Sequence, residues 1–211
     1  MTNIYKLHPW HGIETGEESP GLVTAFIEII PSDTVKYEID KMSGYLKVDR
    51  PQKFSNIVPA LYGFIPQTYC KEALAKVNME HTGRLNILGD GDPLDILVLT
   101  EREITHGDII VKAYPIGGFR LVDNNEADDK IIAVLKNDDI YGQWKDIRDV
   151  PATIINRLKH YFLTYKQMPD KPPTCIIDEV YGKEAAYEVI HAAIIDYNNH
   201  YRNGEMNKNE L

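Results

Sequence analysis

The sequence is poor in cysteine and in long apolar runs, and both shortages limit what the chain can be. Only Cys70 and Cys175 occur among 211 residues. They are too few to imply a disulfide framework, and the sequence leaves their pairing open. No apolar stretch approaches the length that spans a membrane, and the first residues lack the apolar segment of a signal peptide. We therefore expect a cytoplasmic protein with no membrane partner.

Basic residues are scarce relative to acidic ones. The chain has 23 Lys and Arg against 32 Asp and Glu, a formal net charge of −9. This balance argues against a nucleic-acid partner, which needs a basic surface. The phosphate-binding loop of nucleotide hydrolases is absent, and no serine or cysteine nucleophile motif is evident. The hydrophobic content of 43% predicts one domain over residues 1–211, with a short N-terminal extension and a polar C-terminal tail.

The most informative segment places three carboxylates within six residues, Asp90-Gly91-Asp92-Pro93-Leu94-Asp95. These charges repel one another unless a proton or a cation intervenes, and Mg²⁺ takes such oxygen ligands. Pro93 favours an extended Asp92, so we expect a turn that leads into a strand. The alternative is an acidic surface turn. An EF-hand is excluded, because Leu94 and Asp95 would stand at the fifth and sixth loop positions.

A second acidic cluster lies at residues 121–130, directly before the apolar run 131–135. It again crowds carboxylates at the edge of a predicted strand, here with Lys130 among them. Two acid-rich strand ends in one small domain can face each other and hold several metal ions, an arrangement used in phosphoryl chemistry.

A third charged patch alternates along a predicted strand, so that Lys36, Glu38 and Asp40 share one face. The same pattern also fits a half-exposed strand with a charged outer face. Arg50 ends the next strand-like stretch. Cations placed beside several carboxylates indicate an anionic substrate bridged by metal.

These segments resemble the soluble, Mg²⁺-dependent inorganic pyrophosphatases of family I. The resemblance runs from about Phe26 to about Lys166 and is nearest the plant-type branch. Its motifs, in chain order, are IEI with Glu28, VKYEIDK at 35–41, KVDR at 47–50, YGFIP at 62–66, GDGDPLDILV at 89–98, DNNEADDK at 123–130 and HYFLTYK at 160–166.

The resemblance implies a Mg²⁺-dependent inorganic diphosphatase that hydrolyses pyrophosphate by direct attack of a metal-activated water, with Mn²⁺ also tolerated. Asp90, Asp95 and Asp128 would hold the first metal, and Asp95 would also face a second. Asp92 would be catalytic, accepting a proton from the attacking water. Family members form hexamers or dimers, so the resemblance also implies a homo-oligomer.

The remaining roles concern the substrate. Asp123 and Asp128 would receive a metal that arrives with pyrophosphate, and Glu38 would contact another through water. Glu28 would support the site from behind. The residues that would grip the two phosphates are Lys36, Arg50, Tyr62, Lys130, Tyr165 and Lys166.

The sequence departs from the family pattern at three places. Val58 stands where many members have Tyr, and Asn124 replaces an acid common in bacterial members. An insertion spans about residues 68–86 and has a composition that permits a helix. It would be a lid, an interface element or simple decoration. Two other functions stay open: a non-catalytic metal- or phosphate-binding module, and a phosphatase for another small phosphate compound.

Hydrophobic patterning predicts strands first and helices later, an α+β class. Helical spacing links Ile154 to Tyr165 and Ala186 to Tyr197. The family fold is a small OB-like antiparallel β-barrel with two main helices packed outside. The predicted strands are 23–30, 35–40, 45–49, 94–99, 108–115 and 130–135.

Overall fold

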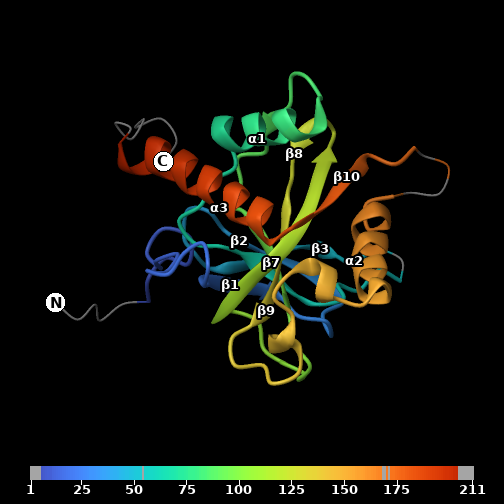
Figure 1. Cartoon of the computed structure of the whole chain (residues 1–211). Helices are drawn as coiled ribbons and strands as arrows, with labels where there is room; N and C mark the ends of the chain where they lie inside the picture. Colours follow the sequence, from blue (N-terminus) through green and yellow to red (C-terminus); the bar gives the residue numbers. More distant parts are fainter. Residues whose placement is uncertain (1–5, 54, 168–169, 171, 204–211) are drawn as a thin grey trace.

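A ring of five strands forms the centre of the computed structural model, which describes residues 6–53, 55–167, 170 and 172–203 (Figure 1). Neighbours in this ring are hydrogen-bonded, and β7 pairs back with β1 to close it. In ring order its strands are β1 (Val23–Ile29), β4 (Leu61–Phe64), β6 (Asp95–Leu99), β9 (Lys130–Leu135) and β7 (Ile109–Asp123). The predicted α+β class and barrel are confirmed.

One pairing in the ring differs from the expected antiparallel pattern. β6 and β9 are parallel, with Asp95 opposite Lys130. The chain leaves β6, returns along the long strand β7 and then enters β9, so β6 and β9 run in the same direction. This register puts two residues of the predicted site side by side at one end of the barrel.

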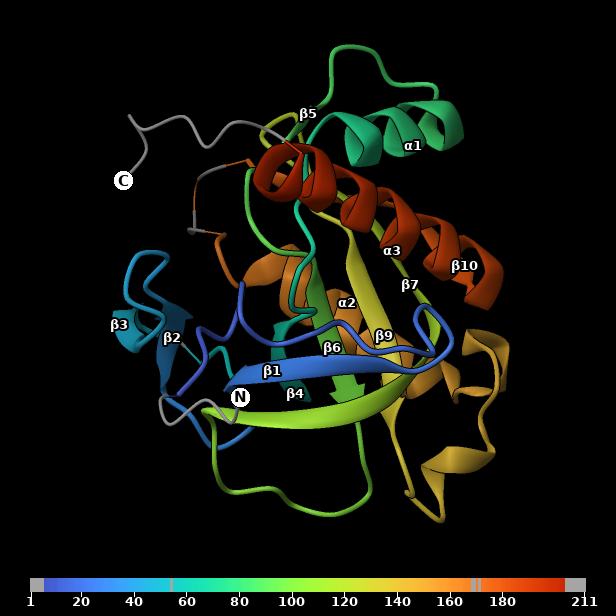
Figure 2. The same ribbon diagram turned by 90° about the vertical axis from the view of Figure 1, so that its left-hand side faces the viewer.

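The strands form where apolar side chains can be buried on both faces of the sheet. Along β9, Ile131 and Ala133 join one apolar cluster, while Ile132 and Val134 join another. Successive strand residues point to opposite faces. The first cluster is covered by α3 (Lys183–Tyr197) and the second by α2 (Ala152–Thr164). Both helices match the predicted spacing, and Figure 2 shows them on different sides of the strands.

Shorter strands extend this framework. β2 (Val35–Ile39) and β3 (Leu46–Pro51) form a separate antiparallel hairpin. β10 (Cys175–Gly182) pairs with β7, while β5 (Leu88–Gly89) and β8 (Glu126–Ala127) pair with each other in parallel. The sequence did not predict β4, nor these three strands.

The prediction for residues 108–115 was too short. β7 continues through Pro115 and two glycines to Asp123, with a break in register between Pro115 and Gly117 where it faces β9. A bulge lets a strand continue past residues that normally end it. The extension carries Asp123 to the same end of the barrel as Asp95.

The insertion contains a third helix, α1 (Glu72–Thr82). Its N-terminus is capped from α3, because the buried carboxylate of Asp196 accepts hydrogen bonds from the backbone nitrogens of Lys71 (2.9 Å), Ala73 (2.9 Å) and Leu74 (3.0 Å). The first backbone N–H groups of a helix have no partner within it, so this contact stabilises α1. α1 is therefore fixed to the body of the protein.

Short helical turns complete the described chain at Tyr141–Gln143, Ile147–Asp149 and, in π-helical form, Asn198–Arg202.

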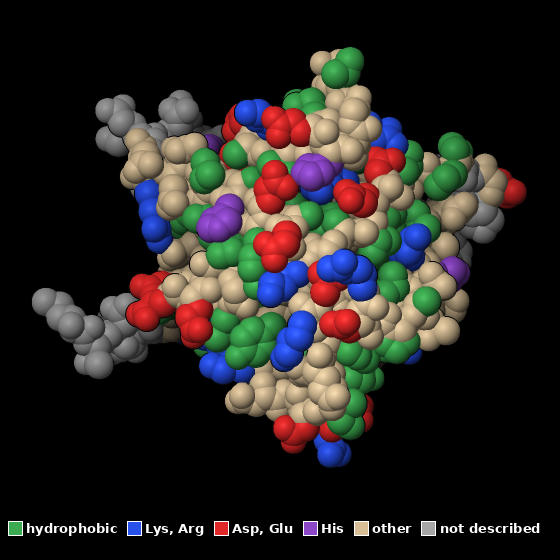
Figure 3. Space-filling view, in the orientation of Figure 1, with side chains coloured by type: hydrophobic (Ala, Val, Ile, Leu, Met, Phe, Trp, Pro, Cys, Tyr) green, Lys and Arg blue, Asp and Glu red, His purple; other side chains and the backbone are tan. Residues whose placement is uncertain are grey.

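Cys70 and Cys175 are both buried free thiols. Within the described residues, no helix has the length and apolar character needed to cross a membrane. The face in Figure 3 carries interspersed acidic and basic side chains. The predicted C-terminal tail beyond residue 203 lies outside the described residues.

Replacing Asp196 with alanine should destabilise the protein by about 1–2 kcal/mol, because three backbone N–H groups at the start of α1 lose their acceptor. Urea unfolding would measure this as a lower midpoint. Glu80→Ala, at an exposed position of the same helix, serves as control and should change stability by less than about 0.5 kcal/mol. Equal midpoints for the two variants would contradict the capping role.

Candidate active site

The pairing of β5 with β8 brings the two acidic clusters together. Leu88 lies opposite Glu126 and Gly89 opposite Ala127 in parallel register. Asp90 and Asp128 directly follow these two strands in the chain and therefore lie side by side. Burial, followed by the charges of Asp128 and Asp92, raises the pKa of Asp90 to about 9. The predicted repulsion is therefore present, and Asp90 holds a proton near neutral pH.

The segment between Asp90 and Asp95 is the turn that the sequence predicts. Gly91 has a φ of +77°, a conformation that side-chain-bearing residues rarely adopt. The backbone nitrogen of Asp92 donates to Oδ1 of Asp90 at 2.9 Å. The chain then passes Pro93 and enters β6 at Asp95. This tight turn places the carboxylates at the mouth of the barrel.

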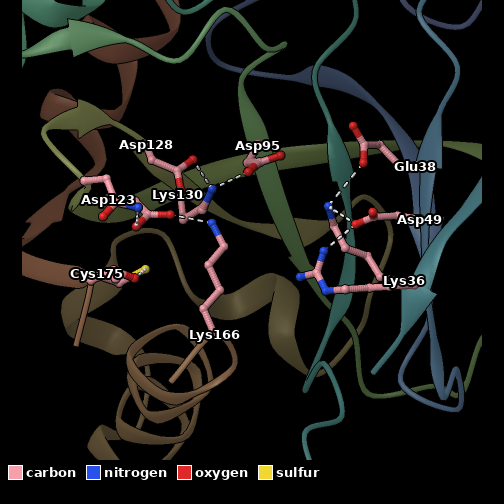
Figure 4. Close-up of polar contacts among 12 residues, drawn as sticks. Lys36, Glu38, Asp49, Asp95, Asp123, Asp128, Lys130, Lys166 and Cys175 are labelled. Carbon is pink, nitrogen blue, oxygen red and sulfur yellow. Dashed lines mark hydrogen bonds and ion pairs between the residues drawn. The ribbon is translucent and has the colours of Figure 1, made fainter. Parts of the chain in front are cut away.

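Lys130 is the central cation of the site. Its ammonium group contacts the carboxylates of both Asp95 and Asp128, and its side chain is 1% exposed (Figure 4). Burial by itself lowers the pKa of Lys130, but Asp128 and Asp95 raise it well above the usual value, so Lys130 stays charged. The Tyr62 hydroxyl donates to Oδ2 of Asp95 at 2.6 Å. These contacts join β4, β6 and β9 at one point.

Asp123 stands beside this group at the end of β7, paired with Lys166. Burial opposes ionisation of Asp123, but the hydrogen bond and charge of Lys166 bring its pKa below the usual value. Asn124 and Asn125 both have positive φ, 48° and 71°, as a two-residue hairpin turn requires. Asn124 also donates to Oδ1 of Asp123 at 3.1 Å. Its amide therefore helps to fix the orientation of the Asp123 carboxylate at this turn.

Tyr165 follows the last turn of α2, next to Lys166. The ammonium group of Lys166 lies 5.2 Å from the centre of the Tyr165 ring. Burial raises the pKa of Tyr165 above its usual value, and the same cause raises that of Tyr62. Both hydroxyls therefore keep their protons; Tyr165 can donate to an anion, whereas Tyr62 donates its one proton to Asp95 and reaches an anion only by leaving that carboxylate. Val58 is fully buried in the apolar cluster that also contains Phe162, so the family's usual hydroxyl has no counterpart there.

A second charged group lies on the β2–β3 hairpin. Lys36 contacts Glu38 at 3.3 Å and Asp49 at 3.0 Å, and Arg50 pairs with Asp49. Figure 4 shows this group opposite the one around Lys130. Asp40, which alternation places on the same face, instead accepts from the backbone and hydroxyl of Ser43 and shapes the hairpin turn.

Glu28 links the hairpin to the barrel. It is buried on β1, and its Oε1 accepts from the backbone nitrogen of Ile39 at 2.6 Å. Burial raises the pKa of Glu28 to about 8, against the opposing effect of that hydrogen bond. Glu28 thus sets the position of β2 from behind the charged face.

Comparison with known proteins identifies the family of this chain. The family model "Inorganic pyrophosphatase" matches residues 25–198. The chain is 50% identical over 200 residues to an inorganic pyrophosphatase of Chlamydia caviae, covering 92% of this chain and 93% of the relative. The crystal structure of the Thermus thermophilus inorganic pyrophosphatase matches with a TM-score of 0.76 at 28% identity, covering 91% of this chain and 99% of that one. A structure from Anaplasma phagocytophilum, described as an inorganic phosphatase, matches at 0.74 and 30% identity, covering 88% and 98%.

This chain belongs to the inorganic pyrophosphatase family. The family is metal-dependent, and the resemblance read from the sequence is confirmed. The branch within the family stays a prediction.

Two residues of this candidate site, Lys41 and Asp49, were not predicted from the sequence. Lys41 pairs with Asp92 and donates to the carbonyl of Gly91 at 3.1 Å. It reaches them from the hairpin turn, about 50 residues away, and no local pattern signals such a contact. Asp49, in contrast, had a signal, because it directly precedes Arg50 in a strand that pairs with Lys36.

The donor chemistry of the site fits a hard divalent cation. Its carboxylates supply oxygen ligands, and negative charge remains in excess around Asp90 even with Lys130 present. Among the described residues, no three His, Cys, Asp or Glu side chains are already gathered as a metal site. The carboxylates are paired with lysines instead. A metal ion must therefore compete with Lys130 and Lys166 for the same oxygens.

A cavity of about 600 Å³ lies elsewhere, lined by the end of β6, residues 100–104 and the start of α2. Asp95 begins β6, whereas this cavity adjoins Leu99 at its other end. The chemistry of the carboxylates and lysines, and not the cavity, locates the site.

The raised pKa of Glu28 should make stability depend on pH. The folded protein keeps this proton up to about pH 8, while the unfolded chain releases it near 4.5. The unfolded state therefore binds fewer protons in this window, and stability falls as pH rises through it. Urea unfolding with a chelator, from about pH 5 to about pH 8, should show a steeper loss for the wild type than for Glu28→Gln. Equal slopes would contradict the buried protonated state.

Proposed function

We propose that this chain hydrolyses pyrophosphate to two phosphates by direct attack of water, with no covalent enzyme intermediate. The observation that carries the proposal is the buried Lys130, held between Asp95 and Asp128 and opposite the hairpin cation Lys36 (Figure 4). Carboxylates and cations alternate around one small region. This arrangement suits a compact, highly charged anion that arrives with metal.

Mg²⁺ is the proposed cofactor, with Mn²⁺ as a tolerated substitute. When bound, the metal lowers the pKa of water and screens the charge of pyrophosphate. The residues that would hold it are Asp90, Asp95, Asp123, Asp128 and Glu38.

Asp92 is the proposed proton acceptor for the attacking water. Its backbone is fixed by the hydrogen bond to Asp90, while its carboxylate is about half exposed and paired with Lys41. A carboxylate that reaches solvent from a rigid turn can meet a water molecule and pass its proton on to bulk water. Lys41 orients this carboxylate from the hairpin.

The substrate is gripped from two sides in this proposal. Lys36 and Arg50 approach from the hairpin, and Lys130 and Lys166 from the barrel end. An Arg guanidinium presents a planar fork to phosphate oxygens, whereas each Lys presents a compact charge. The protonated hydroxyls of Tyr62 and Tyr165 add neutral donors. A substrate with an organic group would leave some of these donors unpaired.

We further propose that the protein acts in the cytoplasm, as a homo-oligomer that is a hexamer or a dimer. The family resemblance supports both statements.

Phosphate release tests the proposal. The purified protein should release phosphate from pyrophosphate with Mg²⁺ and lose this activity when a chelator removes the metal. ATP and p-nitrophenyl phosphate, tested in parallel, should be poor substrates. Full turnover in chelator would contradict the metal requirement, and preference for p-nitrophenyl phosphate would indicate a broader phosphatase. Metal binding without turnover of any substrate would indicate a binding module.

Amide replacements should separate the proton acceptor from the metal ligands. Asp128→Asn should weaken Mg²⁺ binding, because an amide oxygen lacks the charge that offsets Mg²⁺ dehydration. Asp92→Asn should bind Mg²⁺ nearly as well as the wild type but turn over roughly 10²–10⁴-fold more slowly, the usual contribution of a general base. Calorimetry measures binding, and steady-state kinetics at saturating Mg²⁺ measure turnover. An equal loss of Mg²⁺ affinity in both variants would make Asp92 an ordinary ligand.

A further inference from the structure

The helix α1 of the insertion lies against the strand pair that carries the metal-binding aspartates. Met79 of α1 packs on a small apolar cluster formed by Ile87, Val122 and Ala127. Ile87 directly precedes β5, which leads to Asp90, and Ala127 ends β8, which leads to Asp128. Figure 1 shows α1 next to β8. The helix therefore backs the point where the two acidic clusters meet.

The contact between α1 and this strand pair is close. A Cβ atom on Gly89 would lie 2.4 Å from the carbonyl oxygen of Cys70 and 2.4 Å from Cα of Lys71. Such contacts with backbone are not tolerated, so glycine is required where β5 passes the start of α1. The backbone of Cys70 also accepts from Gly91 at 3.0 Å and donates to Asp92 at 2.9 Å. The start of the insertion and the acidic turn are thus one hydrogen-bonded unit.

Asp129 provides a second, polar link to α1. It stands between Asp128 and Lys130, whose side chains meet each other in the site. Its own carboxylate is fully buried and accepts from the Asn78 amide of α1 at 3.1 Å and from Arg120 of β7 at 3.4 Å. Each oxygen of Asp129 is therefore held by a different element.

Arg120 completes this buried network. Its side chain has no solvent exposure, its guanidinium lies 4.6 Å from the centre of the Tyr181 ring, and its Nη2 lies 3.5 Å from a Glu179 carboxylate oxygen. A buried ion pair is weak evidence for stability, since apolar residues of similar size often serve as well. Its geometric effect is specific, because the directional contacts at Asp129 fix the orientation of the residues on either side.

We propose that Asn78 and Asp129 are positioning residues that align Asp128 for metal binding and hold Lys130 beside it, and that this is the role of the insertion helix. The inference rests on the proposed function of the site and adds the part that α1 plays in it. Residues behind a metal site that orient its ligands typically change metal affinity about 10–100-fold when they are mutated. Asn78 and Asp129 act less directly, through the backbone that joins Asp129 to Asp128 and Lys130.

Mg²⁺ binding in the absence of substrate tests the proposal. Calorimetry should show about 10-fold weaker binding for Asn78→Leu, which removes the amide donor. Asn78→Ser, whose side chain is too short to reach Asp129, gives the same test with less risk to folding. Leu74→Ala on the same helix is the matched control, since Leu74 is fully buried but lies in a different, apolar cluster. It should lower the unfolding temperature and leave Mg²⁺ affinity unchanged.

A reciprocal exchange separates positioning from mere packing. Asn78→Asp and Asp129→Asn should each weaken Mg²⁺ binding, because the first sets two carboxylates against each other and the second removes the charge that Arg120 contacts at 3.4 Å, leaving Glu179 as its ion-pair partner. The double variant restores one amide and one carboxylate at the contact between residues 78 and 129, but not the charge beside Arg120, so it should recover part of the affinity lost in each single variant. Affinity that follows unfolding temperature across all variants, Leu74→Ala included, would overturn the proposal.

The outcome also separates this inference from the proposed function. If the wild type binds Mg²⁺ but does not hydrolyse pyrophosphate, the proposed function fails while the effect of Asn78 on binding is still measured. If the wild type hydrolyses pyrophosphate and Asn78→Leu and Asn78→Ser bind Mg²⁺ as the wild type does, the inference fails and the function stands.

Discussion

The crowding of carboxylates at one end of the barrel is the constraint on which this structure depends. Asp90, Asp95 and Asp128 lie at this end because β5 pairs with β8 and β6 pairs with β9, both in parallel. The repulsion among these charges is offset in two ways: Lys130 is buried between Asp95 and Asp128, and burial with the neighbouring carboxylates raises the pKa of Asp90, which favours its protonated form. Both devices are ones that a divalent cation can replace, which links the fold directly to metal-dependent chemistry.

The surrounding elements hold this end of the barrel in place. The β2–β3 hairpin brings Lys36 opposite Lys130 (Figure 4), and the hydrogen bond from Ile39 to Glu28 fixes the hairpin on β1. On the other side α1 is capped by Asp196 and packs behind β5 and β8. Elements that lie far apart in the sequence therefore act on the same small region.

Elements that depend on neighbouring residues were predicted from the sequence, whereas elements that depend on tertiary contacts were missed. The turn at Asp90–Asp95 and the helices around Ile154 and Ala186 follow from nearby residues, so the predictions were sound. The lengths of β5 and β8 are two residues each, too short for any period to be read. The continuation of β7 past Pro115 needed the bulge, and the pairing of Lys41 with Asp92 needed the folded hairpin. The proposed role of Tyr165 rests on the family resemblance, because helical periodicity alone predicts an ordinary core aromatic residue there.

In the metal-free protein a proton relieves the repulsion between these carboxylates. Metal binding should relieve the same repulsion and displace that proton. Counting the protons released when Mg²⁺ binds tests it most directly. Mg²⁺ would be titrated calorimetrically into metal-free protein near neutral pH, in two buffers with different heats of ionisation. Because the pKa of Asp90 is about 9, binding of Mg²⁺ should release about one proton per site, seen as a buffer-dependent binding enthalpy. Tight Mg²⁺ binding with the same enthalpy in both buffers would contradict it.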